Sequence, residues 1–245
     1  MKPIVLIPAR MASTRLPGKP LADIAGRPMI VHVLDRARAA DVGPVAVATA
    51  EREIADVVER AGGTAILTDP GLPSGSDRIW QALQKLDPAG RYDTIINLQG
   101  DLPGVEPACL RAVLRPLDDP STDIATLVAP VQDRAEAIAE SVVKVACAFP
   151  DEATKARALY FSRMPIPWGH GPLWHHVGIY AYRRAALARF VSLPESALEK
   201  REKLEQLRAL EAGMTIGCAR IETAPFGVDT PADLERARVL SGAGA

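Results

Sequence analysis

Three cationic side chains stand close together near the beginning of the chain. An apolar run at 4–7 is followed by Arg10, Arg15 and Lys19, and Gly18 directly precedes the lysine. Open parallel sheets bind their ligands outside the carboxyl ends of their strands. If the apolar run is a buried strand, the three cations lie where a polyanion binds, and a triphosphate is the commonest such ligand. A solvated turn with unrelated charges is the less favoured interpretation.

Two aspartates stand where strands are expected to end. Asp101 follows an apolar segment, and Asp229 precedes a helix expected to begin at about Pro231. Carboxylates at such positions suit Mg²⁺, which prefers oxygen ligands and shares them with phosphates and water. Either aspartate could instead cap a turn or a helix. Since Thr230 or Asp233 can cap the last helix, Asp229 remains a metal candidate.

The loop after the first apolar run matches neither common phosphate-binding fingerprint. The pattern GxxxxGK[ST] needs a hydroxyl after its lysine, and here Pro20 follows Lys19. The pattern GxGxxG, which follows the first strand of dinucleotide-binding domains, is also missing from this loop. We therefore expect neither an ATPase-type loop nor a fold of the dehydrogenase type.

A group of histidines offers a different kind of site. His170, His175 and His176 stand close together, and imidazole is a frequent ligand of transition metals. A metal cluster is the less favoured interpretation, because no cysteine or carboxylate accompanies these histidines at ligand spacing.

The composition is that of an ordinary globular protein. The chain has 245 residues, 48% of them hydrophobic, and a formal net charge of −1. A surface that binds nucleic acid or an anionic membrane usually shows a basic excess, so neither partner is expected. The three cysteines lack a CxxC pair, which favours reduced core thiols over a disulfide framework or a zinc site. We expect a soluble, cytoplasmic protein without a signal peptide.

Short β-branched runs alternate with segments of helical period, which predicts an α/β fold with a mixed, mostly parallel, Rossmann-like sheet flanked by helices. Strands are expected at 4–7, 45–49, 64–68, 93–101, 124–131, 142–149, 158–161, 177–182 and 216–221. Helices are expected from 28, at 51–61, after a cap at Ser76 or Asp77, around 198–212 and from 231. The stretch at 163–176 is interpreted as a loop or flap, against which Trp168 and Trp174 pack.

A series of segments resembles the 3-deoxy-manno-octulosonate cytidylyltransferase family, whose members are also called CMP-Kdo synthetases. The segments are IPARMASTRLPGKPLADIAGRPMIVHVLDRA near the start, SGSDR (74–78), NLQGD (97–101), ALYFSR (158–163), HVGIYAYR (176–183), LEQLR (204–208) and GVDTPADLE (227–235). Each motif alone is weak, but the ordered series is specific. The resemblance implies an α/β nucleotidyltransferase that acts as a homodimer, uses Mg²⁺, and couples CTP to the acid sugar Kdo for lipopolysaccharide synthesis, with release of pyrophosphate.

The resemblance also implies roles for individual residues. The residues that would contact CTP are Arg10, Arg15 and Lys19 at the triphosphate, and Arg78 and Gln99 at the cytidine. Asp101 and Asp229 would hold magnesium. Arg10, Lys19 and the two aspartates would thus form the catalytic group.

The acid-sugar pocket is implied in the same way. The residues that would line it are His176, Tyr180, Glu205 and Gln206, with Arg163 or Lys144 near the sugar carboxylate. An arginine suits a planar carboxylate because its fork can pair with both oxygens. His176 would donate a hydrogen bond to a sugar hydroxyl. The chain would form one domain, 1–245, with a nucleotide-binding half at 1–130 and a sugar-binding and dimerisation half at 131–245.

Two positions depart from the family pattern. The family usually has a glutamate where this chain has Leu102, and it tends to have an aspartate where this chain has Ala50. The first departure keeps open a cytidylyltransferase for another acid sugar, such as 8-amino-Kdo or sialic acid. A nucleotidyltransferase for another base and a non-catalytic nucleotide-binding protein are further alternatives. Because a binding module need not keep both metal carboxylates, the non-catalytic alternative is the less favoured one.

Overall fold

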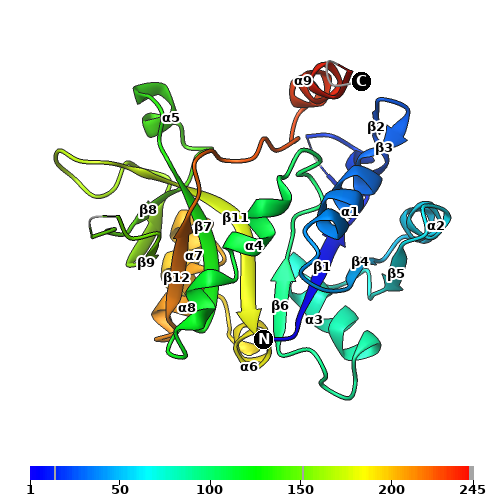
Figure 1. The fold of residues 1–245 in the computed structure, drawn as a ribbon, viewed down its shortest axis with the longest axis horizontal. Coiled ribbons are helices and arrows are strands. Elements are labelled where there is room, and N and C mark those ends of the chain that lie inside the picture. Colours follow the sequence, from blue (N-terminus) through cyan, green and yellow to red (C-terminus); the bar gives the residue numbers. More distant parts are fainter. Residues whose placement is uncertain (14, 151, 243–245) are drawn as a thin grey trace. The chain divides into compact units, whose positions relative to one another are not determined.

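The computed structural model describes residues 1–13, 15–150 and 152–242. The chain divides into two compact units, one formed by Met1–Leu110 with Pro225–Ala245 and the other by Arg111–Ala224 (Figure 1). The predicted halves, 1–130 and 131–245, do not coincide with these units, because the end of the chain returns to the first unit. The functional assignment of those halves stays a prediction.

Parallel strands form the centre of the first unit. They are β1 (Pro3–Ala9), β4 (Val45–Thr49), β5 (Thr64–Leu67) and β6 (Thr94–Asn97), in the order β5-β4-β1-β6. All pairings among them are parallel. The chain adds β4 and β5 on one side of β1 and then places β6 on the other side. The strand order therefore reverses next to β1, and open α/β sheets bind ligands at such a switch point.

Helices cover the strands of this unit. They are α1 (Met29–Ala39), α2 (Arg52–Arg60), α3 (Gly75–Leu86) and α9 (Pro231–Gly242), with the short elements η1 (Lys19–Leu21), β2 (Asp23–Ile24) and β3 (Arg27–Pro28). The predicted apolar face of α1 is confirmed, because Ile30, Val33, Leu34 and Ala37 are fully buried. Helices α1 and α2 contact each other and β4, while α3 contacts β1, β4 and β5.

The predicted cap of α3 was placed two residues or more too late. Ser74 caps the helix, and its Oγ accepts a hydrogen bond from the backbone N–H of Asp77 at 3.2 Å. Ser76 lies inside the helix and is buried. Asp77 instead occupies the third helical position, where its carboxylate accepts from the Ser74 hydroxyl at 2.7 Å. A serine and an acidic residue three positions apart make the usual capping signature.

The second unit has a mixed sheet. Its strands are β7 (Ile124–Pro130), β8 (Lys144–Ala146), β9 (Lys155–Arg157), β10 (Tyr160–Ser162), β11 (Trp174–Arg183) and β12 (Ile216–Arg220). The order is β11-β7-β12-β9, and β8 pairs with β10 and β11. Strand β12 runs parallel to β7, whereas β11 runs antiparallel to it. The predicted α/β class with a mixed sheet is thus confirmed.

The helices of the second unit are short. They are α5 (Arg134–Ile138), α6 (Arg184–Ser192), α7 (Ala197–Glu202), α8 (Leu207–Glu211) and η2 (Arg115–Asp118), and α4 (Pro107–Ala112) begins before the boundary. The single helix predicted around 198–212 was wrong. Lys203 adopts a left-handed conformation with φ of 57°, and this conformation ends α7. The chain then forms a separate helix, α8. Among the described residues, no helix is long and apolar enough to cross a membrane.

The loop predicted at 163–176 was too long. Trp174, His175 and His176 belong to β11. Trp174 is buried and packs against the ring of Phe149, with 4.7 Å between centroids. Trp168 is 99% exposed, so the prediction that it packs against the loop was wrong. The three cysteines predicted as core thiols are free and buried.

Candidate functional site

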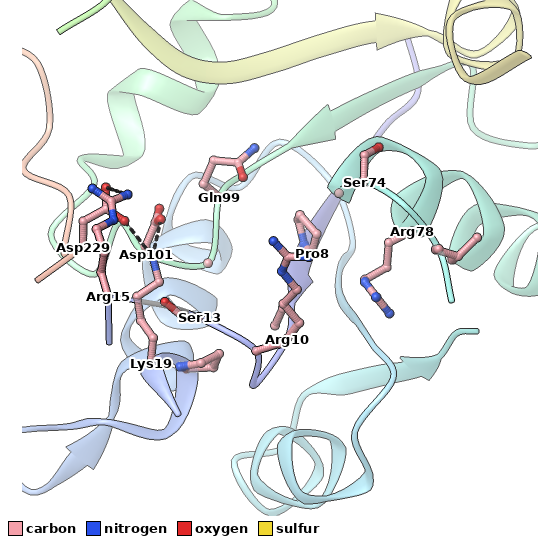
Figure 2. A pocket seen from close by; sticks show the side chains of 16 residues that line it. Pro8, Arg10, Ser13, Arg15, Lys19, Ser74, Arg78, Gln99, Asp101 and Asp229 are labelled. Atoms are coloured by element: carbon pink, nitrogen blue, oxygen red, sulfur yellow. Dashed lines mark hydrogen bonds and ion pairs between the residues drawn. The ribbon is translucent and has the colours of Figure 1, made fainter. Parts of the chain in front are cut away.

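A pocket of about 430 Å³ lies in the first unit where β1 and β6 end. Its walls come from the ends of these strands, the loop after β1, the start of α3 and the segment before α9 (Figure 2). The residues predicted to bind the nucleotide and the metal all line it: Arg10, Arg15, Lys19, Arg78, Gln99, Asp101 and Asp229. The fold thus brings together residues that are more than two hundred positions apart in the sequence.

An ion cluster forms one end of this pocket. Lys19 Nζ lies 2.8 Å from Asp101 Oδ2 and 3.0 Å from Asp229 Oδ1. Arg15 Nη2 lies 3.0 Å from Asp229 Oδ2, and Figure 2 shows all four side chains gathered at this end. Burial disfavours the charge of Lys19, but the two carboxylates outweigh this effect and hold the pKa of Lys19 above its ordinary value. The two carboxylates therefore favour the protonated form of Lys19.

Backbone contacts place the cluster. Gly18, with φ of 70°, donates its N–H to the carbonyl of Met11 at 3.2 Å and thereby turns the loop so that Lys19 begins η1. The N–H of Val228 donates to the carbonyl of Asp101 at 2.9 Å. This bond holds the segments that carry the two aspartates side by side.

Helix α9 is capped without using Asp229. The carboxylate of Asp233 accepts from the backbone N–H of Thr230 at 2.9 Å and from that of Asp229 at 3.2 Å. Thr230 Oγ1 in turn accepts from the N–H of Asp233 at 3.2 Å. The prediction that Thr230 or Asp233 caps this helix is confirmed, and the Asp229 carboxylate faces Lys19 and Arg15 instead.

Arg10 and Arg78 lie at the other end of the pocket, apart from the ion cluster, and Gln99 lies nearer to Asp101 than to Arg78 in this view (Figure 2). Arg78 is buried, and its Nη1 donates to Thr68 Oγ1 at 2.6 Å. Burial, together with repulsion from Arg10, lowers the pKa of Arg78 from its ordinary value. Two arginines beside one cavity favour an anionic or carbonyl-rich ligand.

The two aspartates fit a divalent cation that arrives with phosphate. Their oxygens already converge on one positive atom, Lys19 Nζ. In the described part of the chain, no group of three or more His, Cys, Asp or Glu side chains could hold a metal ion. A transition-metal cluster at His170, His175 and His176 is therefore not formed there. Mg²⁺ needs only one or two carboxylates when substrate phosphates and water complete its shell.

Leu102 does not belong to the pocket wall. Its side chain is 8% exposed and packs beside Gly227, where an added Cβ would lie 3.6 Å from Leu102 Cδ2. At the position where the family usually has a glutamate, this chain therefore has an apolar side chain in a packed contact. The seven residues predicted for the nucleotide and metal still line the pocket.

The residues predicted for the acid sugar lie in the second unit. The rings of His176 and Tyr180 have centroids 5.4 Å apart, and Glu205 is close enough to Tyr180 to help raise its pKa. Burial is the main cause of that raised pKa, so Tyr180 keeps its proton. Gln206 is buried, and among the described residues its Nε2 has no hydrogen-bond partner. An unpaired buried donor costs about 1–3 kcal/mol, which a ligand oxygen would recover.

His176 is neutral in this environment. Burial, with a smaller effect of the neighbouring His175, lowers the pKa of His176 to about 3. Its Nε2 lies 3.0 Å from Thr126 Oγ1, and that hydroxyl also lies within hydrogen-bond distance of the carbonyls of Val177 and Ile179. Because the hydroxyl has one hydrogen to donate to a carbonyl, it accepts from the ring N–H. The ring then has Nδ1 as an acceptor, so this arrangement does not support the predicted role of His176 as a donor to a sugar hydroxyl.

Lys144 and Arg163 are held by backbone carbonyls. Lys144 is fully buried, and its ammonium donates to the carbonyls of Ala139 at 2.9 Å, Val142 at 2.6 Å and Arg163. Burial, with repulsion from Arg163, lowers the pKa of Lys144. Arg163 Nε donates to the carbonyl of Glu202 at 3.0 Å, and its Nη2 makes a longer contact of 3.4 Å with Lys203.

Sequence reasoning missed several residues that organise these sites. Thr68, which holds Arg78, ends a run predicted as a strand, and a polar residue at such a position was the available signal. Glu202 accepts hydrogen bonds from Ser162 Oγ at 2.9 Å and from the backbone N–H of Arg163 at 3.1 Å. Arg208, within LEQLR, pairs with Glu199 at 2.5 Å. The sequence carries no local signal for these long-range pairs.

Comparisons with known proteins agree with this arrangement. The profile of the family described as Cytidylyltransferase matches residues 4–216. The 3-deoxy-manno-octulosonate cytidylyltransferase of Rhodospirillum centenum is 62% identical over 97% of this chain and 93% of that protein. The protein of the same name from Paramagnetospirillum magneticum is 57% identical over 98% of each chain.

Solved structures give the same result. A CMP:2-keto-3-deoxy-manno-octonic acid synthetase complexed with CTP is 41% identical, with a TM-score of 0.91 over 100% of both chains. A nucleotidyl transferase from Methanothermobacter thermautotroptrophicus is 17% identical, with a TM-score of 0.61 over 100% of this chain and 99% of that chain, and shares the fold. On the strength of these identities, the chain belongs to the 3-deoxy-manno-octulosonate cytidylyltransferase family.

Proposed function

We propose that the protein is a nucleotidyltransferase that couples CTP to 3-deoxy-manno-octulosonate (Kdo), giving CMP-Kdo and pyrophosphate. The observation that carries this proposal is the Lys19-centred ion cluster at the ends of β1 and β6, in a chain 62% identical to an enzyme of that name. We assign the reaction to the cytoplasm, as a step that supplies Kdo for lipopolysaccharide.

The anomeric hydroxyl of Kdo attacks the α-phosphorus of CTP. A new oxygen–phosphorus bond forms, the bond from the α-phosphorus to the bridging oxygen breaks, and pyrophosphate leaves. Such a displacement needs alignment and charge neutralisation more than covalent help from the protein. Arg10, Arg15 and Lys19 neutralise the β- and γ-phosphates and the leaving pyrophosphate. Arg78 and Gln99 bind the cytidine.

Enzymes of this kind generally use a divalent metal ion, and we assign Mg²⁺ to Asp101 and Asp229. When bound, Mg²⁺ neutralises charge on the α-phosphate and favours loss of the proton of the attacking hydroxyl. The two carboxylates supply anionic oxygens from separate segments, held together by the Val228–Asp101 backbone bond. Lys19 and Arg15 are then available to the phosphates.

The second unit binds the acid sugar. The neutral ring of His176 and the hydroxyl of Tyr180 contact sugar hydroxyls, with Glu205 beside Tyr180. The buried Gln206 amide donates to a further oxygen. Arg163 pairs with the sugar carboxylate, because three of its five N–H donors bind the carbonyls of Glu140, Glu202 and Lys203 and two remain for a ligand. The three N–H groups of the buried Lys144 ammonium all donate to backbone carbonyls.

The protein acts as a homodimer. Large apolar side chains of the second unit are exposed in the chain described here, namely Ile138, Leu159, Met164 and Trp168. Exposed apolar groups of this size favour coverage by another chain. Sedimentation velocity at several protein concentrations tests this state, and a monomer throughout the range would contradict it.

Pyrophosphate release is the direct test of the function. The purified protein is assayed with CTP and Mg²⁺ and with Kdo, 8-amino-Kdo or sialic acid in parallel, and Kdo is then assayed with UTP and GTP. Release with CTP and Kdo is the expected result. Preference for the amino sugar would change the substrate while keeping the mechanism. Preference for another nucleotide would contradict the cytidine assignment. If no pyrophosphate is released in any assay, a non-catalytic binding protein would be favoured.

A further inference from the structure

Glu51 lies outside the pocket wall but is tied to the loop that forms it. The glutamate follows β4 and precedes α2. Its Oε1 accepts from the backbone N–H of Met11 at 2.9 Å, and its Oε2 accepts from Thr49 Oγ1 at 2.9 Å. Thr49 is fully buried, and its Oγ1 also accepts from the backbone N–H of Glu51 at 3.2 Å. Both oxygens of this carboxylate are thus fixed by separate donors.

These bonds extend the pairing of two strands. The last residue pair of β1 with β4 is Ala9 with Thr49, where both strands end. Glu51 then bridges the gap through its side chain and holds the loop at Met11. A half-buried side chain therefore replaces the next backbone contact of the sheet.

Met11 connects this anchor to the ion-binding residues. Its neighbour Arg10 lines the pocket. Its carbonyl accepts from the N–H of Gly18, which directly precedes Lys19. Met11 therefore makes two backbone hydrogen bonds. Its N–H binds Glu51, and its carbonyl binds Gly18, so one residue links the loop both to β4 and to the segment that carries Lys19.

We propose that Glu51 is a positioning residue for CTP binding: by accepting the N–H of Met11 it holds Arg10 and Lys19 in the arrangement that grips the triphosphate. This inference rests on the proposed function of the pocket. In this chain the carboxylate at residue 51 fixes the loop, whereas residue 50, where the family tends to have an aspartate, is an alanine. Displacing Met11 would move cations relative to phosphates, and small misplacements of binding groups are costly.

The length of the side chain and its charge can be tested separately. Glu51→Gln keeps the reach, since the amide oxygen can accept from Met11 and the amide nitrogen can donate to Thr49, but it removes the charge. Glu51→Asp keeps the charge but withdraws the oxygens by about one carbon–carbon bond, ~1.5 Å. Glu53→Gln and Glu53→Asp are matched controls, because Glu53 is exposed in the first turn of α2, the helix that Glu51 precedes.

Calorimetric titration with CTP and steady-state kinetics give the readouts, and thermal unfolding confirms that each variant is folded. Glu51→Asp is expected to raise the Kd and KM for CTP about 10-fold with a smaller change in kcat, while Glu51→Gln stays within about 3-fold of the wild type. The negative charge of Glu51 also acts on Arg78, whose pKa it raises. The reverse order of the two variants would show that this charge matters instead, and unchanged CTP affinity in both variants would also overturn the proposal. If the wild type itself fails to bind CTP, the proposed function fails first, before the variants are compared.

Discussion

The ammonium of Lys19 lies 2.8 Å from Asp101 Oδ2, so a cation proposed to bind phosphate and a carboxylate proposed to bind metal neutralise each other in the free protein. Asp229 shares the same ammonium at 3.0 Å. If Mg²⁺ and CTP bind as proposed, each of these side chains would exchange a protein partner for a ligand partner. The charges of the site would then be paired both before and after binding.

Replacing Lys19 should uncouple the two ligands. Lys19→Met leaves Asp101 and Asp229 without their shared cation, so Mg²⁺ alone should bind the nucleotide-free protein more tightly than it binds the wild type. CTP should bind at least about 10-fold more weakly, because a charge-assisted phosphate contact is lost. Calorimetric titrations with MgCl₂ and with CTP measure both effects. Lys200→Met, at an exposed surface pair, is the control, and equal affinities in the two variants would contradict the prediction.

Replacing Asp101 should abolish most turnover. Asp101→Asn keeps the size of the side chain but removes the anionic oxygen, so we expect kcat to fall at least about 100-fold, since metal stabilisation of the transition state is worth several kcal/mol. Circular dichroism should be unchanged. Asp118→Asn, at an exposed carboxylate of the other unit, is the control. Near-normal pyrophosphate release by Asp101→Asn would rule out this metal site.

Much of the first unit could be predicted because its signals are local. The apolar run at β1 and the polar residues after β6 fall where parallel strands end, and the topology then places Lys19 beside Asp101. Other features depend on contacts that are distant in the sequence. The residues next to Lys144 in the sequence do not predict that its ammonium binds backbone carbonyls. The conformation of Lys203 that divides α7 from α8 is likewise not evident from its residue type.

His176 should make stability depend on pH. Its folded-state pKa of about 3 lies below the ordinary value of about 6.5, so between these values the unfolded state holds more protons. The free energy of unfolding therefore rises with pH through this window, and its loss between pH 7 and pH 5 is about 2 kcal/mol. Urea unfolding of His176→Gln should show a correspondingly smaller difference between these pH values.

A histidine in the same chain provides the comparison for that measurement. His170 is exposed in the loop before β11, so His170→Gln should keep the full pH dependence of the wild type. Both variants keep the residues of the hydrogen bond between His175 Nδ1 and Glu136 Oε1, which are 2.7 Å apart. The prediction fails if both substitutions reduce the pH dependence to the same extent.

The pair of Arg208 with Glu199 should matter for stability far more than a surface pair. Two contacts join them, at 2.5 Å and 2.9 Å, and their side chains are only 11% and 9% exposed. Arg208→Met leaves a buried carboxylate uncompensated, which should reduce the free energy of unfolding by about 3–5 kcal/mol. Lys200 and Glu195 lie 3.9 Å apart with side chains 63% and 65% exposed, so Lys200→Met should cost less than about 1 kcal/mol.

Urea unfolding at one pH distinguishes this pairing from simple packing of the arginine stem. Arg208 also lies over the ring of Phe190, 5.3 Å from its centroid, and Met retains part of that apolar contact. The double variant Arg208→Met with Glu199→Gln should recover much of the loss, because it removes the unpaired charge as well. If the double variant is as unstable as the sum of the two single variants, the two side chains are not coupled and the loss comes from packing alone.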